Sequence, residues 1–360
     1  MPQRATDFLD VGTQEFRDID KFTQHIQEHV DLSDIDGKLS IIGSVSNFDH
    51  KEMFEESLEH YFEIERELGD LHIAHATSNG KDIPIYIHQN DGCPLFLTTG
   101  RKTKDIPNTI GSYIREQTDI SRMWVGKKQM EEIRREITYD TDILVPYFTA
   151  HYSPSSKVEN ITRPGYERTV QYYGDDGVEA FKSMRDRYGV FPTNIQFKKP
   201  GVFKFRITQE GVFTINDGGV GPAVDLLQGV IDHLRGVKNA IRSAKYGSVE
   251  SEFGEFPKSV PWKIELDRAL ASRDVEFIDK GLESDEWEFG VSNIDKSLED
   301  QIGFSGEIVD KINYGTVGVR TKDEKNIRVF PREVTGFGQS VRLFSFIQNN
   351  IDKNASAAKA

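Results

Sequence analysis

Apolar residues recur at helical spacing in several stretches of the chain. The clearest pattern runs from Ala223 to Ala244 in alternating steps of three and four, with Pro222 at the first turn and Gly247 beyond the end. A second pattern predicts a helix over residues 50–68, with Asp49 as its N-cap and Gly69 after its end. Further helices are expected over residues 13–31, 107–117, 121–137 and 178–188.

Alternation of apolar and polar residues predicts antiparallel strands between these helices. Asn79-Gly80 and Asp91-Gly92 are strong hairpin signals, and Pro200-Gly201 and Glu210-Gly211 mark two further turns. The expected strands are 39–42, 71–74, 83–88, 95–98, 143–152, 194–197, 202–208, 212–215, 307–312, 315–321 and 327–330. The pattern therefore predicts an α+β protein.

With 360 residues, the chain is longer than one hydrophobic core usually organises, so we expect a multidomain protein. We divide it into an N-terminal α/β unit (residues 1–100), a central helix-plus-antiparallel-sheet unit ending in the long amphipathic helix (101–247) and a C-terminal region (248–360). The C-terminal region is expected to hold helices near 263–272 and 293–302 and a small β unit at about 303–347. The strand spacing of that unit is similar to that of SH3-like barrels, and the tail 353–360 is expected to fray.

Charge is distributed unevenly along the chain. The net charge is −14, yet residues 101–247 hold 23 Lys and Arg against 18 Asp and Glu, and the segments on either side are acidic. Nine of the 12 tyrosines also fall in this central stretch. Positive charge together with aromatic rings is typical of a surface that binds a polyanion.

The cations of the central region are therefore candidate nucleic-acid contacts. Four of them, at spacings of three and four, would form one stripe along the long helix. The alternatives are that they complement the negative end of the helix dipole, and that Lys127 and Lys128 pair with acids four residues on. The candidates are Arg101, Lys102, Lys104, Lys127, Lys128, Arg134, Arg135, Arg235, Lys238, Arg242 and Lys245.

A glycine-rich turn precedes the long helix. Asp217, Gly218, Gly219 and Gly221 lie between a predicted strand and a helix N-terminus, where backbone amides can hold an anion. The string resembles the Asp-x-Gly-x-Gly adenine-contacting box of the ATPase family shared by sensor histidine kinases and mismatch-repair clamps. The resemblance implies an ATP site, although the helix over 178–188 offers Glu179 without the Asn of that family. The alternative is a tight turn that needs glycine for its backbone angles.

Two patterns suggest metal ligands and are weighed against simpler explanations. His25-Ile26-Gln27-Glu28-His29 matches the H-x-x-E-H string of inverted zinc proteases, but no third-ligand motif follows. A carboxylate face on the helix over 50–68 (Glu52, Glu56, Glu59, Glu63, Glu67) is expected to be solvated, and His72 and His75 point to opposite faces of a strand. We therefore predict no metal site from the sequence.

The predicted function is non-catalytic binding of a polyanion, with DNA or RNA as the favoured ligand. A nucleotide-dependent enzyme using residues 217–221 and a scaffold that docks an acidic protein partner remain alternatives. The single cysteine, Cys93, and the lack of an apolar stretch of signal-peptide or membrane-spanning length favour a cytoplasmic protein with no membrane partner. Catalysis, cofactor and oligomeric state are left open.

Overall fold

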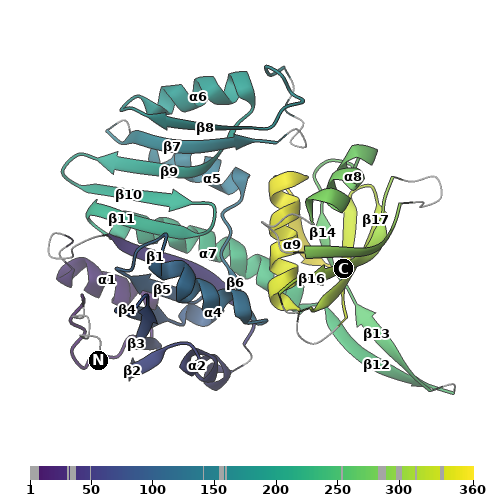
Figure 1. Ribbon diagram of the computed structural model, residues 1–360, viewed down its shortest axis with the longest axis horizontal. Helices are drawn as coiled ribbons and strands as arrows, with labels where there is room; N and C mark the ends of the chain where they lie inside the picture. Colours follow the sequence, from purple (N-terminus) through teal and green to yellow (C-terminus); the bar gives the residue numbers. More distant parts are fainter. Residues whose placement is uncertain are drawn as a thin grey trace. The chain divides into compact units, whose positions relative to one another are not determined.

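The computed structural model describes residues 8–30, 32, 38–48, 50–140, 142–153, 158, 160–252, 254–282, 289–296, 302–312, 314–332 and 336–360. The chain divides into two compact units. Unit 1 comprises residues 1–115, 122–152 and 158–232, and unit 2 comprises 116–121, 153–157 and 233–360. Helix α7 (Gly221–Arg242) contributes residues to both units. Within the described parts, helices combine with three antiparallel sheets, which confirms the α+β class (Figure 1).

Unit 1 is built on one long antiparallel sheet. Its strands lie in the order β2-β3-β4-β5-β1-β11-β10-β9-β7-β8, so β2 and β8 lie at opposite ends. The strands are β1 (Leu39–Ser46), β2 (Glu63–Leu68), β3 (Leu71–Ser78), β4 (Lys81–His88), β5 (Leu95–Thr98), β7 (Leu144–Tyr152), β8 (Arg168–Tyr173), β9 (Phe191–Lys199), β10 (Phe203–Thr208) and β11 (Val212–Gly218). The short strand β6 (Ile120–Arg122), which contains residues of both units, pairs with β1.

The central strands join residues that are far apart in the sequence. Leu39 of β1 is opposite Ile215 of β11, and Ser40 is opposite Thr98 of β5. Every residue of β1 is buried, because this apolar strand has neighbours on both edges and is covered on both faces. One sheet therefore spans the predicted N-terminal and central regions.

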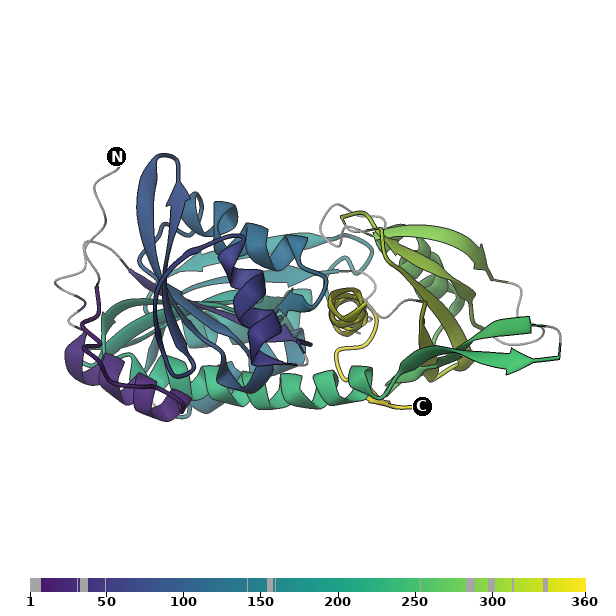
Figure 2. The same ribbon diagram turned by 90° about the horizontal axis from the view of Figure 1, so that it is seen from below.

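Helices complete the core of unit 1. They are α1 (Ile19–His29), α2 (Lys51–Glu59), the 3₁₀ turn η1 (Asn90–Gly92), α3 (Asp105–Asn108), α4 (Ile110–Glu116), α5 (Lys127–Ile137) and α6 (Gly177–Tyr188). Helix α1 lies beside the N-terminal part of α7 (Figure 2), where Gly221 leaves room for the Gln27 amide. Helix α6 covers β7 and β8, with Phe181 packed edge-on against Phe148. The patterns over 178–188 and 223–244 are confirmed as α6 and α7.

The helix predicted over residues 50–68 is wrong in its second half. Helix α2 ends at Glu59, and residues 63–68 form the edge strand β2. Exposure alternates residue by residue along β2, because only one face of this hairpin strand meets the core. Asp49, the predicted N-cap, lies outside the described residues, and His50 occupies the N-cap position.

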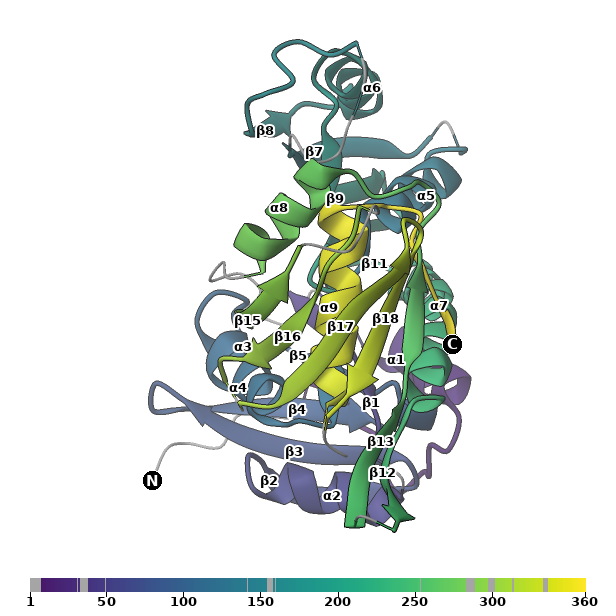
Figure 3. The ribbon, with the colours of Figure 1, turned by 90° about the vertical axis from the view of Figure 1, so that its right-hand side faces the viewer.

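Unit 2 contains a sheet in the order β15-β16-β17-β18-β14-β19 and the hairpin β12–β13 (Figure 3). Its elements are β12 (Lys245–Ser251), β13 (Gly254–Val260), β14 (Trp262–Glu265), α8 (Ser272–Gly281), β15 (Phe289–Asp295), β16 (Ser305–Asp310), β17 (Thr316–Asp323), β18 (Asn326–Pro331), α9 (Phe337–Asn350) and β19 (Ser356–Lys359). Helix α9 packs on the sheet and on α8, with Phe344 near Trp262 and Phe346 stacked on Phe277.

Three predictions in unit 2 need correction. The helix expected near 263–272 is wrong, because β14 ends at Glu265 and helix α8 begins only at Ser272. The helix expected near 293–302 coincides in its described part with the end of β15. The tail expected to fray forms β19, which pairs with β14 from Trp262 to Glu265. The tail is locally polar, which favoured the prediction that it frays. Strand β19 is instead stabilised by pairing with a strand about 90 residues away in the sequence.

Candidate anion-binding site

An open pocket of about 900 Å³ lies in unit 1, between the loop that follows β7 and the C-terminal end of α6. We call it the arginine–tyrosine pocket. It is lined by Thr162, Arg163, Tyr166, Glu167, Arg168, Arg187 and Tyr188.

The pocket is held in place by contacts between the loop and the helix end. Arg168, the first residue of β8, lies with its Cζ 5.3 Å from the ring centroids of both Tyr152 and Tyr188. The Arg168 guanidinium also donates to the carbonyl of Arg163. Stacking and hydrogen bonding of this kind restrict both the guanidinium and the loop. Arg168 therefore stabilises the pocket by holding the loop in place.

Backbone contacts fix the loop further. The Tyr152 hydroxyl donates to the Pro164 carbonyl at 2.8 Å, and the Thr162 amide donates to the Arg187 carbonyl at 2.9 Å. Helix α6 ends in a left-handed Gly189 with φ 67°. A Cβ at Gly189 would lie 3.1 Å from the Tyr152 ring, so the glycine lets the chain turn tightly beside the pocket.

The pocket is electropositive. Within the part of the chain that the structure describes, neither Arg163 nor Arg187 has an acidic partner. The one acid in the lining, Glu167, pairs with His151 at 3.2 Å. Burial lowers the His151 pKa and Lys127 lowers it further, whereas Glu167 raises it. Tyr166 is 71% exposed, so an aromatic face is available next to the arginines.

The structure places most of the predicted unit 1 cations against acids or in the interior. Arg101 donates to the buried Asp105, and Lys128 lies 4.0 Å from Glu132. Arg134 and Arg135 both bind Glu131. Lys127 is buried, and burial lowers the pKa of the half-buried Lys102. Lys104 is exposed.

The predicted stripe on the long helix is incomplete. Helix α7 ends at Arg242, and Lys245 is the first residue of β12, opposite Val260. Lys238 is only 9% exposed, and Arg235 is half-buried. All four cations belong to unit 2, whereas the other seven candidates belong to unit 1.

The glycine-rich turn has a structural explanation. Gly218 has φ 74°, and a Cβ there would lie 2.0 Å from the Val202 carbonyl oxygen. The Gly219 amide donates to that same oxygen at 3.0 Å, so it is already engaged. At Gly221 the nearest group is the Gln27 side chain, and Asp217 is exposed on β11. These contacts favour the tight-turn alternative for this segment.

The H-x-x-E-H string lies on α1. The ring centroids of His25 and His29 are 4.3 Å apart, and His25 Nε2 is 2.7 Å from the Asp10 carbonyl oxygen. Glu28 accepts from Gln24. Among the described residues, this string does not gather three potential metal ligands at one point.

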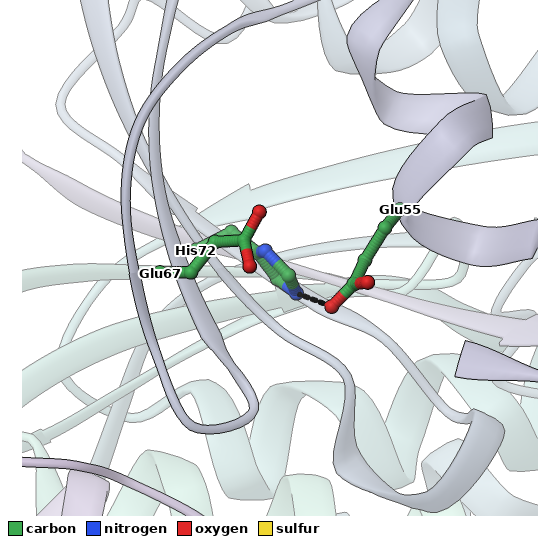
Figure 4. A group of neighbouring side chains, drawn as sticks. All are labelled: Glu55, Glu67 and His72. Carbon is green, nitrogen blue, oxygen red and sulfur yellow. Dashed lines mark ion pairs between the residues drawn. The ribbon is translucent and has the colours of Figure 1, made fainter. Parts of the chain in front are cut away.

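Three other side chains do meet, and we call them the carboxylate–histidine cluster. Glu55 of α2, Glu67 of β2 and His72 of β3 each offer an atom within 4.8 Å of the other two (Figure 4). Glu67 and His72 are opposite each other in the β2–β3 ladder, and Glu55 Oε1 lies 3.8 Å from His72 Nε2. Burial lowers the His72 pKa, the nearby Glu55 raises it in part, and the imidazole is neutral at neutral pH.

Neither the arginine–tyrosine pocket nor the carboxylate–histidine cluster was predicted from the sequence. Glu67 was assigned to a helix face, where it could not oppose His72. The pocket arginines were missed because Arg163, Arg168 and Arg187 are scattered singly through a loop, a strand and a helix end. Their one local signal is that each lies within three residues of a tyrosine, at Tyr166 and Tyr188.

Comparison with known proteins places the pocket in a recognised segment. A family model described as "AF_0896_M: family middle domain" matches residues 128–210, which contain the whole pocket lining. A relative from Archaeoglobus fulgidus, named "Uncharacterized protein", is 25% identical over 357 residues. The alignment covers 95% of this chain and 96% of the relative, so the similarity extends well beyond the middle domain.

Among the described residues, no helix combines the length and the apolar character needed to cross a bilayer.

Proposed function

We propose that the protein binds single-stranded nucleic acid through the arginine–tyrosine pocket. Arg163 and Arg187 contact phosphates, and Tyr166 stacks on a base. The observation that carries the proposal is the pairing of two arginines that lack acidic partners among the described residues with an exposed tyrosine in one open pocket.

The chemistry of the lining fits a phosphate-bearing chain. Guanidinium groups bind phosphate through paired N–H donors, and aromatic faces stack on any unpaired base. Arg168 is engaged by two rings and a carbonyl, so its part is to hold the loop and to add positive charge. The Arg187 guanidinium lies over the Tyr188 ring, with its Cζ 5.1 Å from the ring centroid. Its N–H donors, which lie in the guanidinium plane, still reach a phosphate beside Arg163 while the stacking is kept.

A single strand suits the pocket better than a duplex. Stacking on Tyr166 needs a base that is not already stacked in a helix. The pocket is also a local recess beside an edge strand rather than a long, flat cationic surface. We place the protein in the cytoplasm as part of the same proposal.

Fluorescence anisotropy with labelled single-stranded DNA and RNA tests the proposal. About three charge contacts to a single strand predict a slope of roughly −2 for log K against log salt. Arg163→Ala and Arg187→Ala are each expected to weaken binding roughly tenfold, the loss that one charge-assisted contact causes. Tyr166→Ala is expected to weaken it by a similar factor.

Lys128→Ala is the matched control, because Lys128 is an exposed cation already near Glu132. It removes one positive charge from the same middle segment and should leave the affinity within twofold. Equal losses in Lys128→Ala and Arg187→Ala would show that only net charge matters. No binding at low salt would refute the proposal, and retention of an acidic protein in its place would favour the scaffold alternative.

A further inference from the structure

We propose that Glu55, Glu67 and His72 form a binding site for a divalent transition-metal ion, with Zn²⁺ as the ion it fits best. The proposal is independent of the nucleic-acid pocket. It rests on the convergence of two carboxylates and one buried imidazole at the β2 end of the sheet (Figure 4).

The strongest evidence is the state of the His72 imidazole. His72 is 1% exposed, and its Nε2 has no hydrogen-bond partner among the described residues. A buried polar atom without a partner is unfavourable, so one that faces two carboxylates is a candidate metal ligand. Nε2 faces the carboxylate of Glu55 at 3.8 Å, beyond hydrogen-bonding range.

A neighbouring histidine shows how the same strand satisfies a structural imidazole. His75 is also buried, but its Nδ1 lies 3.0 Å from Asp82 and its Nε2 lies 3.1 Å from Glu65. Both ring nitrogens of His75 are therefore occupied by carboxylates at hydrogen-bonding distance. At His72, three residues away, no carboxylate lies at hydrogen-bonding distance from Nε2 among the described residues, so this nitrogen is available to a metal.

The spacing of the three ligand atoms is close to that of a tetrahedral metal site. Bonds of about 2.1 Å at a tetrahedral angle place ligand atoms about 3.4 Å apart. The three ligand atoms lie within 4.8 Å of one another, so a small movement of the side chains brings them to this spacing. Glu67 is exposed and so can move inward without unpacking the core.

Lys51 supplies the charge that a metal would replace. Its Nζ lies 3.3 Å from Glu55 Oε1 and 3.5 Å from Asp70 Oδ1, and it donates to the Gly69 carbonyl at 2.6 Å. The ammonium thus compensates the charge of the Glu55 and Asp70 carboxylates. A dication at Glu55 would displace it, so Lys51 competes with the metal.

The donor set selects the class of ion. Imidazole nitrogen suits Zn²⁺ and related ions, whereas Mg²⁺ and Ca²⁺ prefer oxygen ligands. Three protein ligands leave at least one coordination position open, as in zinc sites that bind a water or substrate. The site therefore suits exchangeable Zn²⁺ more than a closed structural metal.

Isothermal titration of the metal-free protein with Zn²⁺, and with Mg²⁺ in parallel, tests the proposal. We expect one Zn²⁺ per chain and at least tenfold weaker Mg²⁺ binding. Glu67→Gln is expected to lower Zn²⁺ affinity roughly 100-fold, since even loss of an outer-shell partner costs 10- to 100-fold. Co²⁺ provides a second readout through the visible absorption of a low-coordinate site.

Two further variants sharpen the result. Lys51→Met removes the competing ammonium and should raise Zn²⁺ affinity, an effect that a purely structural cluster would not produce. Glu56→Gln is the matched control, because Glu56 is exposed on the same helix outside the cluster, and it should leave affinity unchanged. His72→Gln should abolish binding, and Glu67→Gln keeps the test valid if that buried substitution prevents folding.

Absence of Zn²⁺ binding, or equal affinity in wild type and Glu67→Gln, would overturn the proposal. Either result leaves the proposed function standing, because oligonucleotide binding is measured at different residues. Conversely, a failure to detect oligonucleotide binding would leave the expected stoichiometry of one Zn²⁺ per chain unchanged.

Discussion

At the scale of single residues, His88 is a buried imidazole that the structure keeps neutral. It is 1% exposed and stacks on Phe22 with ring centroids 5.7 Å apart, and its Nδ1 accepts the Asn90 amide. Burial lowers its pKa to about 4, while Asp70 and Asp18 raise it slightly. The side chain therefore resists protonation only as long as the protein stays folded.

This gives a prediction for stability against pH. Because the His88 pKa is lower in the folded than in the unfolded chain, the unfolded state binds more protons between pH 6.5 and 4, and stability falls as the pH drops. From pH 7 to pH 5 this group alone should cost about 2 kcal/mol of unfolding free energy. Urea unfolding at pH 7 and at pH 5 measures this change in unfolding free energy.

His88→Gln is the variant for comparison, because glutamine keeps a polar side chain and does not titrate. Its unfolding free energy should depend less on pH between 7 and 5 than that of the wild type. His60→Gln is the control, because it makes the same substitution at a histidine that is exposed on the surface next to α2. Parallel slopes in His88→Gln and wild type would contradict the prediction.

Arg101 shows how a residue can fit a charge pattern and have a different role. Its side chain and backbone amide both donate to Asp105, a nearly fully buried carboxylate. These bonds are the main reason that the Asp105 pKa is lowered to about 2. A count of cations in the sequence cannot distinguish an arginine that pairs with a carboxylate of the same chain from one that is available to a ligand. The difference depends on which carboxylates lie next to the arginine after folding.

At the scale of elements, the sequence predicted best where the pattern was long and locally capped. Helices α6 and α7 and strands β16 to β18 follow their predicted ranges within a few residues. Prediction failed for β2, where Ile64 and Leu68 are spaced as on a helix face but lie in the β2–β3 hairpin. Pairing with a partner strand overrode local helix propensity there.

The same error hid the carboxylate–histidine cluster. On a helix over 50–68, Glu67 would extend a solvated face that starts at Glu52. In the hairpin, Glu67 lies opposite His72 and on the side of Glu55. A site made by cross-strand register and a helix cannot be found before the register is known.

The connection between β11 and α7 allows a sharp test of two glycines. Gly218→Ala places a Cβ 2.0 Å from a backbone oxygen at a positive φ, which should cost at least about 2 kcal/mol of stability. Gly219→Ala is the control one residue on, because its Cβ would meet only Val202 O, at 4.0 Å. Thermal unfolding of both variants measures the difference.

If the turn instead held a nucleotide, the two substitutions would act differently. Gly219→Ala would then weaken thermal stabilisation by ATP with magnesium while leaving the ligand-free protein unchanged. We expect no such stabilisation in the wild type, because the Gly219 amide already donates to Val202. A rise in melting temperature with ATP would support the nucleotide alternative.

At the scale of the whole molecule, the two proposed sites lie at opposite ends of one sheet. Glu67 belongs to β2 and Arg168 to β8, the first and last strands in the sheet order. At about 4.8 Å per strand, nine steps separate them by on the order of 40 Å along the sheet. The Debye length at physiological salt is about 8 Å, so a dication at one end is screened from phosphates at the other.

The two ligands should therefore bind independently. Oligonucleotide affinity measured with and without saturating Zn²⁺ should change by less than twofold, a coupling free energy of under about 0.4 kcal/mol. Linkage requires the same small effect of oligonucleotide on Zn²⁺ affinity, so titration in the reverse order is an internal control. Glu67→Gln should abolish the Zn²⁺ dependence of any residual change. A coupling above about fivefold in both directions would mean that the sheet has two arrangements that both ligands bias, and that the sites form one functional unit.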